Sequence, residues 1–406
     1  MRYIKIGALA PAVTLLGVVV FLIVSDRLGQ PAPPDPASLI AKAGQYNVRI
    51  QRDTFGVPHV IGPRDVDVAF GFGFAHAEDD FSTIQQVALA VRGQLAAIEG
   101  PKAAVPGDRS DLIWRKYLPF DKVPQLWNPP AGFVFNSNNT PFHATVPADD
   151  LKPQDFSPTL GIQTEMTNRA WRALETYGAD PRITAAAFRA YKYDLIYSVR
   201  SDLAQIIAEV LAIDPGNDAD LQQAHDILKR WDRSTDVANR SAALAVLMGE
   251  PVLRARMDGK PPRRPIDMLR DAIYTLKTHF GRLDPEWGEV NRLRRGKLDL
   301  AIDGAPDVYR GVYGEKQPDG TLTAVAGDTL IMFVAWDKAG KLTSESVHQF
   351  GSATTDQNSP HYADQSPLFV AMKTKVVLFT QPQLAEHIEA DFWPGNREKV
   401  APMPNH

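Results

Sequence analysis

The chain has 406 residues, of which 44% are hydrophobic and 23% are charged, so it is long enough to bury a large core in one to three domains. Its formal net charge of -4 offers no basic surplus, which leaves a nucleic-acid partner without electrostatic support. There is no cysteine, so the sequence excludes thiolate nucleophiles, disulfides and cysteine metal sites.

The first residues are typical of an export signal. Arg2 and Lys5 precede an uncharged apolar run from Ile6 to Val24. The run is long enough to cross a hydrocarbon core of ~30 Å as a helix, and no small-residue cleavage site follows it closely. Residues 1–28 are therefore expected to be a signal peptide or, preferably, an uncleaved membrane anchor, which places the rest of the chain in the periplasm or on the outer face of the inner membrane. The Pro-rich residues 29–45 are expected to form a stiff tether.

Short extended segments and a long helix are predicted after the tether. Residues 48–60 alternate apolar and polar side chains around a glycine-containing turn, which predicts a β-hairpin. From Asp65 the apolar residues recur at helical spacing past Val91 toward Ile98. Gly100 marks the expected end of this helix.

The centre of the chain is predicted to be helical and its C-terminal third to return to strands. Apolar residues recur every three or four positions in three ranges, Phe188–Val210, Leu221–Trp231 and Ile266–Phe280, as in helices that bury one face. These faces are typical of a core scaffold. Residues 329–342 (TLIMFVAWDKAGKL) predict a buried strand and a turn, and residues 374–380 (TKVVLFT) predict a second strand of similar character.

Two clusters of polar residues suggest chemistry at first sight. Ser352, His361 and Asp364 supply the residue types of a hydrolase triad, but no Gly-x-Ser-x-Gly motif is present and a triad is defined by geometry. A turn-rich loop whose polar groups bond one another is the favoured interpretation. His76 has the helical spacing of two metal ligands with Asp79 or Asp80, but no third ligand follows at a telling spacing, so an acidic helix segment is the favoured interpretation.

The stretch from Phe133 to Phe142, FVFNSNNTPF, gathers several amides in one place. A loop that leaves a strand explains them, because asparagine tolerates unusual backbone angles and caps turns. The alternative is an amide N–H donor held at a strand end, where it stabilises negative charge that develops on a substrate oxygen. These residues alone do not decide between the two interpretations.

Longer stretches of the chain resemble a known family. Residues 48–86, VRIQRDTFGVPHVIGPRDVDVAFGFGFAHAEDDFSTIQQ, resemble the opening of penicillin acylases and acyl-homoserine-lactone acylases. Later blocks of that family are resembled, in the same order, by LPFDKVPQLWNPPAGFVFNSNNTPF (118–142), WGEVNRL (287–293), GDTLIMFVAW (327–336) and QFGSATTDQNSPHYADQSPLF (349–369). The resemblance covers nearly all of residues 46–395.

The resemblance implies an α+β fold similar to the αββα sandwich of N-terminal-nucleophile hydrolases, with a helical insertion and incomplete in this chain. Residues 46–114 resemble the N-terminal subunit of the family, and residues 115–406 resemble the later part of the catalytic subunit. Such enzymes hydrolyse the C–N bond of small acyl amides with an N-terminal serine. The α-amino group of that serine acts as the base, and its unperturbed pKa of ~7.7–8.0 suits reaction near neutral pH.

The resemblance also assigns roles to individual positions. Asn138 matches the family asparagine that helps to hold the oxyanion, whereas Asn136 and Asn139 are expected to form turns. Arg169 lies three residues beyond the position of the family arginine, so it is either a displaced substitute or, preferably, a charge on a helix surface. Asp150 is the single match to the calcium-binding carboxylates of related acylases. One ligand makes no calcium site, so no cofactor is expected.

The departures from the family concern the nucleophile. The two family-like parts are fused around Trp114–Arg115, and the one Gly-Ser pair, Gly351-Ser352, belongs to a C-terminal block. We therefore expect that the chain lacks the nucleophile block, has little or no amidase activity, and leaves sheet edges and apolar faces uncovered. The alternative is a non-catalytic protein that uses the remaining acyl pocket to bind an acyl compound or a partner.

Overall fold

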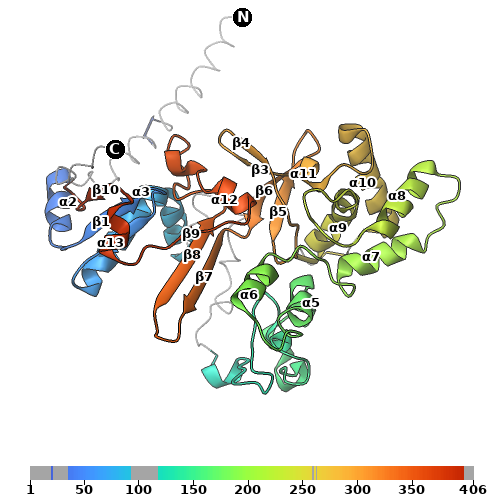
Figure 1. Ribbon diagram of the computed structural model, residues 1–406, viewed down its shortest axis with the longest axis horizontal. Coiled ribbons are helices and arrows are strands. Elements are labelled where there is room, and N and C mark those ends of the chain that lie inside the picture. Colours follow the sequence, from blue (N-terminus) through green and yellow to red (C-terminus); the bar gives the residue numbers. More distant parts are fainter. Residues whose placement is uncertain (1–19, 22–34, 93–117, 258–259, 262, 397–406) are drawn as a thin grey trace, which may run out of the picture. The chain divides into compact units, whose positions relative to one another are not determined.

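The computed structural model describes residues 20–21, 35–92, 118–257, 260–261 and 263–396. Helices dominate the middle of this part of the chain, and mostly antiparallel strands lie toward both ends (Figure 1). The α+β class predicted from the sequence is therefore confirmed. The described residues form two compact units, one made of the segments up to Thr54, 58–78 and from His387 onward, the other of 55–57 and 79–386.

The smaller unit contains the predicted hairpin. β1 (Arg49–Asp53) pairs antiparallel with β2 (Pro58–Ile61), so this prediction is confirmed. On its other side β1 pairs with β10 (Ile388–Phe392), a C-terminal strand that the sequence did not predict. The next helix lies close against the hairpin at Gly71, where an added Cβ would stand 2.4 Å from the Val48 side chain.

Two helices accompany this sheet. α2 (Pro36–Ala43) lies inside residues 29–45, which were expected to form a stiff tether, so that expectation is wrong for this part. A helix forms because the Asp35 carboxylate accepts from the first N–H groups and Pro36 occupies the first turn. α3 (Asp65–Val91) begins where predicted. It kinks at Asp80, whose carboxylate accepts from the hydroxyl and the N–H of Thr83 and so restarts the helix. The end predicted at Gly100 lies outside the described residues.

Within the described ranges, no helix combines the length and the apolar content that a membrane span requires. The apolar run Ile6–Val24 lies outside those ranges except for Val20 and Phe21. The signal peptide or anchor at residues 1–28 and the exported location therefore stay predictions.

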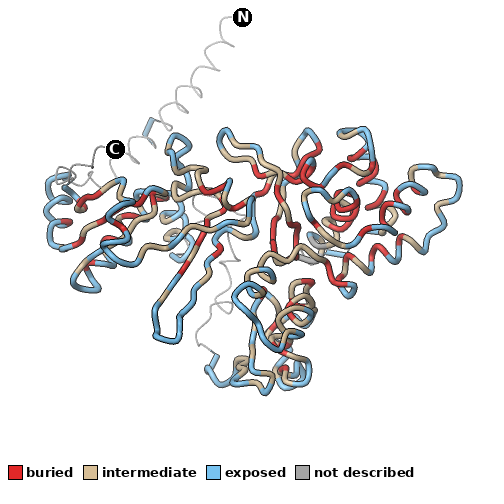
Figure 2. Tube along the Cα trace, in the orientation of Figure 1, coloured by how far each residue is buried: buried red, intermediate tan, exposed pale blue. Residues whose placement is uncertain are grey.

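The larger unit has a helical core. α7 (Asp202–Leu211), α8 (Ala219–Arg230), α9 (Ala242–Met257) and α10 (Pro265–Phe280) pack apolar faces whose residues are almost all buried (Figure 2). The faces predicted at 221–231 and 266–280 are confirmed, and Gly281 ends α10 with a φ of 67°. The sequence did not predict α9, because residues 242–246 are all buried and show no polar face.

The continuous helical face predicted from Phe188 to Val210 is wrong. The structure has α6 (Ala185–Lys192) and then α7, with an extended stretch between them. In that stretch Tyr197 N–H donates to the Arg233 carbonyl, and the Leu195 carbonyl accepts from Thr235 N–H. Hydrogen bonds to another segment replace the helical ones, and the Ser201 hydroxyl caps a new helix.

Two sheets and several short helices complete the larger unit. One sheet has the order β4-β3-β6-β5, formed by β3 (Asn291–Arg295), β4 (Leu298–Ala301), β5 (Val312–Lys316) and β6 (Leu322–Gly327). The other has the order β7-β8-β9, formed by β7 (Leu330–Trp336), β8 (Leu342–His348) and β9 (Lys375–Val376). The short helices are α5 (Asn168–Glu175), α11 (Trp287–Val290), α12 (Ser366–Val370) and α13 (Gln381–Ala385).

β7 is a strand as predicted, but it is not buried. Ile331 is 2% exposed, whereas the alternate residues facing the other way are open: Leu330 is 48%, Met332 51%, Val334 45% and Trp336 66% exposed. Because β7 is also an edge strand among the strands that the structure describes, the expectation of an uncovered edge and apolar face is confirmed for this part of the chain. The second predicted strand, 374–380, shrinks to the two residues of β9, because Thr380 already caps α13.

The open face of β7 is expected to drive self-association. Val334→Lys places a charge in that face and should lower the associated fraction severalfold in light scattering over a concentration series. Val325→Lys on β6 is the matched control, since Val325 is 48% exposed but lies outside the β7 face. If the two substitutions lowered the associated fraction equally, the β7 face would not be the surface that drives self-association.

His225 on α8 makes stability depend on pH. It is 3% exposed, and its Nε2 has no hydrogen-bond partner among the described residues. Burial lowers the pKa of His225, with Lys229 adding to the effect. An unfolded histidine titrates near pH ~6.5, so the stability that neutral His225 contributes is fully present above that pH. This contribution is lost as the pH falls toward the folded pKa, by at most about 1.4 kcal/mol per pH unit.

We therefore expect the free energy of unfolding to fall as the pH drops below about 6.5, and to fall less in His225→Leu. Denaturant unfolding at a series of pH values measures this slope. Gln223→Leu, at an exposed position on α8, introduces the same leucine without removing a titratable group and should leave the slope unchanged. A wild-type slope retained in His225→Leu would disprove the assignment.

Candidate active site

The candidate site begins in loop 131–150, which is held together by side chains and not by a sheet. The Asp150 carboxylate accepts from the N–H groups of Ala144 (2.9 Å) and Thr145 (3.0 Å). Phe135 N–H donates to the Ala144 carbonyl, but no strand forms. The expectation that the asparagine-rich stretch follows a strand is therefore wrong, because a single backbone hydrogen bond does not make a ladder.

The asparagines of this loop have distinct roles. Asn136 Oδ1 accepts from Asn138 N–H at 2.8 Å, and Asn139 Oδ1 accepts from Ser137 N–H at 2.7 Å. The Asn136 contact reaches two residues forward, as in an asparagine-initiated turn, so the turn predicted at Asn136 is confirmed. Asn139 instead accepts from a residue before it and donates to the Thr140 and His143 carbonyls, so it braces the loop and its predicted turn is not confirmed. Asn138 itself has a φ of 63°, a left-handed conformation that asparagine tolerates better than most residues.

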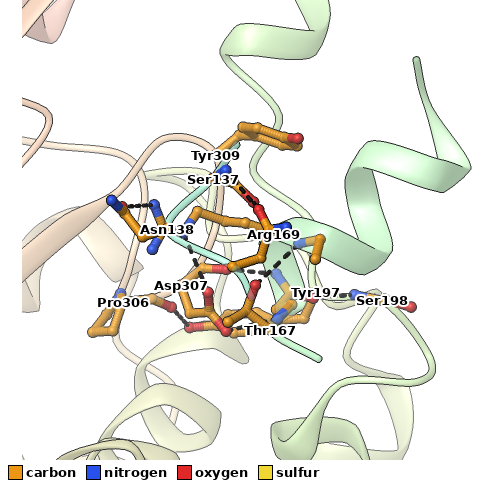
Figure 3. Close-up of polar contacts among 12 residues, drawn as sticks. Ser137, Asn138, Thr167, Arg169, Tyr197, Ser198, Pro306, Asp307 and Tyr309 are labelled. Atoms are coloured by element: carbon orange, nitrogen blue, oxygen red, sulfur yellow. Dashed lines mark hydrogen bonds and ion pairs between the residues drawn. The ribbon is translucent and has the colours of Figure 1, made fainter. Parts of the chain in front are cut away.

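Arg169 connects this loop to α5. The Thr167 hydroxyl caps α5 by accepting from Ala170 N–H, and Arg169 projects from the first turn of the helix. Its Nη1 donates to Asn138 Oδ1 at 2.9 Å, and its Nε donates to Asp307 Oδ1 at 3.2 Å (Figure 3). The structure thus brings Asn138 and Arg169 together, so the preferred interpretation of Arg169 as a helix-surface charge is not what the structure has. Since Asn138 Oδ1 is engaged, Nδ2 is the atom of its carboxamide left to meet a substrate oxygen.

Asp307 is a site residue that the sequence did not indicate. Its Oδ2 accepts from Asn168 N–H at 2.7 Å, and its carbonyl accepts from Asn168 Nδ2 at 2.8 Å. Asn168 Oδ1 also accepts from Ser198 N–H at 2.8 Å, which ties three chain segments together. Burial raises the pKa of Asp307, while the hydrogen bonds from Asn168 and Arg169 oppose that shift.

Aromatic side chains lie beside the polar cluster. Tyr177 packs edge-on against Phe188, Tyr191 and Tyr309 with ring centroids 5.1–5.9 Å apart. Burial raises the pKa of Tyr177 to about 12 and also raises the pKa of Tyr309. Both phenols therefore stay neutral at physiological pH and form a half-buried aromatic wall.

A cleft of about 670 Å³ lies between the start of α6 and the β7–β8 hairpin. Apolar residues of its lining include Ile183, Phe188, Phe333 and Val334. The Arg189 guanidinium stands 4.2 Å from the centre of the Phe333 ring and donates to Glu345 at 2.7 Å, so its charge is paired. A cleft of this size with a largely apolar lining suits an acyl group.

The alternative triad is not assembled for catalysis. His361 Nδ1 lies 2.8 Å from Asp364 Oδ2. The Ser352 hydroxyl, however, donates to the Phe55 carbonyl at 2.8 Å and so directs its proton away from a base. The favoured interpretation, a loop whose polar groups bond each other and the backbone, agrees with these contacts.

The described residues contain no group of three or more histidine, aspartate or glutamate side chains placed to hold a metal ion. Asp150 uses Oδ1 to accept two backbone N–H groups of its own loop. In the acidic segment of α3, Glu78 pairs with Arg52 at 3.2 Å. These residues do not fit a calcium site, and the expected lack of a cofactor stays a prediction.

Comparison with known proteins decides the family. The family model described as penicillin amidase matches residues 47–109 and 101–386. The chain belongs to the penicillin amidase family. The matched range agrees closely with residues 46–395, over which the sequence resembled penicillin acylases, so that prediction is confirmed.

Individual curated proteins match this chain over short stretches. The acyl-homoserine lactone acylase PvdQ of Pseudomonas syringae pv. syringae (strain B728a) is 28% identical over 99 residues, which are 23% of this chain and 13% of that protein. PvdQ of Pseudomonas fluorescens (strain Pf0-1) is 26% identical over 92 residues, 23% of this chain and 12% of that protein. The matched part of the chain thus spans only about an eighth of these curated relatives' length.

A thermostable penicillin G acylase from Alcaligenes faecalis is a solved structure similar to this chain. The two are 16% identical, with a TM-score of 0.38, over 67% of this chain and 58% of that one. The activity of this chain, its substrates and its partners are therefore matters for proposal.

Asn168 should contribute strongly to stability, because Asn168→Ala leaves Ser198 N–H and the Asp307 carbonyl without their buried partner. We expect a loss of about 2–4 kcal/mol in the free energy of unfolding, measured by denaturant titration. Asn358→Ala, at an exposed position, should change it by less than about 0.5 kcal/mol. Similar losses for the two variants would contradict the role given to Asn168.

Proposed function

We propose that this chain forms the oxyanion-stabilising and acyl-binding part of an amide hydrolase that cleaves C–N bonds, and that on its own it has little or no amidase activity. The observation that carries the proposal is the hydrogen bond from Arg169 Nη1 to Asn138 Oδ1. It leaves the Asn138 amide nitrogen as a directed donor. The apolar cleft beside α6 supplies the acyl-binding surface.

The chemistry of the proposal is charge stabilisation. When a nucleophile adds to an amide carbonyl, the carbonyl oxygen becomes negatively charged, and a donor already in place stabilises it without having to reorganise. Arg169 donates to Asn138 Oδ1 from a guanidinium group, which polarises the carboxamide and strengthens the donor at Nδ2. Removal of one such donor in a hydrolase typically costs roughly a hundred- to a thousandfold in rate.

We propose the lack of activity because the chain is expected to lack the N-terminal serine nucleophile of its family. The family model matches as two separate segments, 47–109 and 101–386, so the match changes over a few residues before the proposed junction. The proposed junction at Trp114–Arg115 lies outside the described residues. Ser352, the serine of the one Gly-Ser pair, is engaged with the Phe55 carbonyl.

A second candidate function is non-catalytic binding of an acyl compound. The cleft of about 670 Å³ favours it, because its volume and apolar lining suit an aliphatic or aromatic acyl group whether or not a bond is cleaved. Both candidates use the cleft, and they differ in whether Asn138 ever faces a tetrahedral intermediate.

Two assays on the full chain test the proposal. Incubation with a chromogenic acyl anilide should release no amine above background. Titration with an arylacetate or a medium-chain fatty carboxylate, which mimics the acyl product, should show binding that weakens about tenfold in Asn138→Ala, the loss of one charge-assisted hydrogen bond. Asn358→Ala is the matched control and should bind as wild type does.

Other outcomes point elsewhere. Binding that Asn138→Ala leaves unchanged would favour the second candidate, with the carboxylate held in the cleft alone. Amine release that disappears in Ser352→Ala and survives in Asn138→Ala would identify a conventional serine hydrolase. A sample that splits into two pieces and turns over an amide would refute the missing nucleophile.

A further inference from the structure

We infer that Asp307 is a positioning residue, which fixes the carboxamide of Asn138 through the guanidinium of Arg169. The inference rests on the proposed function, because it concerns the donor that would meet the substrate oxygen. It assigns a role to a residue that lies 138 positions from Arg169 in the sequence and about which the local sequence is silent.

The first step is the geometry of the Arg169 fork. Nε donates to Asp307 Oδ1 and Nη1 donates to Asn138 Oδ1, so the two contacts use different edges of one rigid, planar group (Figure 3). When Asp307 holds Nε, the direction of Nη1 is set as well. The Arg169 and Asp307 side chains are 21% and 15% exposed, so solvent competes little for the contact between them.

The second step is that Asp307 is itself held in place. Its two carboxylate oxygens accept separately from Arg169 Nε and from Asn168 N–H. Its backbone has a φ of 60°, and its carbonyl accepts from Asn168 Nδ2. Next to it, the Tyr197 hydroxyl donates to the Pro306 carbonyl. A carboxylate with this many contacts is a fixed reference point for the arginine.

The third step is that Asn138 needs such a reference. Asn138 is exposed, and its backbone is fixed by the turn to Asn136. The final torsion of an asparagine side chain is soft, so the backbone alone does not orient the carboxamide. Among the described residues, that carboxamide has one hydrogen bond, which comes from Arg169. Without this hydrogen bond the carboxamide would rotate about its final torsion, and its nitrogen and oxygen would exchange positions.

A purely structural role for Asp307 is the competing explanation, and α5 offers a matched comparison. One turn along, Arg172 Nε donates to Asp194 Oδ2 at 2.5 Å, and the Asp194 side chain is 10% exposed. This pair has the same chemistry, similar burial and the same helix, but Arg172 does not contact Asn138. Asp194→Asn therefore reproduces the structural cost of removing a buried carboxylate beside an α5 arginine.

The experiment measures the order of the Asn138 side chain in the full chain. Asparagine labelled with ¹⁵N at Nδ2 is incorporated, the Asn138 signal is identified by its loss in Asn138→Ala, and ¹⁵N relaxation gives the order parameter. We expect a value above about 0.8 in the wild type and in Asp194→Asn, and a value below about 0.6 in Asp307→Asn. Arg169→Lys keeps the charge and loses the fork, so it should give the same loss of order even if Asp307→Asn does not fold.

The outcomes separate this inference from the proposed function. Order that survives in both Asp307→Asn and Arg169→Lys, or that is lost equally in Asp194→Asn, overturns the positioning role. An arylacetate titrated into the wild type reports on function: a shift of the Asn138 Nδ2 signal supports the oxyanion donor. No shift together with the expected pattern of order would leave Asp307 as a positioning residue and refute the oxyanion role alone.

Discussion

The geometry of the candidate site depends on the two-edged contact of one guanidinium group. Arg169 joins Asn138, 31 positions before it, to Asp307, 138 positions after it. No strand runs through loop 131–150, so no sheet ladder holds Asn138 in place. The planar fork of arginine supplies a fixed angle between its two partners, which a flexible lysine cannot do. The site is therefore built from the first turn of α5 and two loops, which meet at the Arg169 guanidinium.

The parts of the structure that the sequence predicted correctly are those whose cause is local. α8 and α10 each carry an apolar stripe, Asp218 caps the first and Gly281 ends the second, so their signals lie within a dozen or so residues. The turn at Asn136 is equally local, because its side chain bonds a backbone group two residues further on. The family-level resemblance added Asn138, which no periodicity could single out.

The parts that could not be predicted depend on distant neighbours. Asp307 follows a proline in an ordinary-looking turn, and only the fold shows that α5 begins against it. The place of Arg169 on a helix predicts that it is exposed to solvent. Its contact with Asn138 exists only because loop 131–150 reaches α5 at that point. The sequence of β7 predicts a buried strand because all seven of its residues are apolar. Burial, however, requires other elements to cover both of its faces. Even the break between α6 and α7 follows from pairing with residues 233–235.

The energetics of α5 explain why its two buried ion pairs matter more for geometry than for stability. Moving an arginine and an aspartate out of water costs much of what their attraction returns, so such pairs add little net stability. Burial raises the pKa of Asp307, which is the sign of that cost. What each pair does supply is a unique arrangement. Arg172 binds Asp194 in the stretch between α6 and α7, and Arg169 binds Asp307 and Asn138. One short helix thereby fixes both a chain crossing and the direction of an exposed amide.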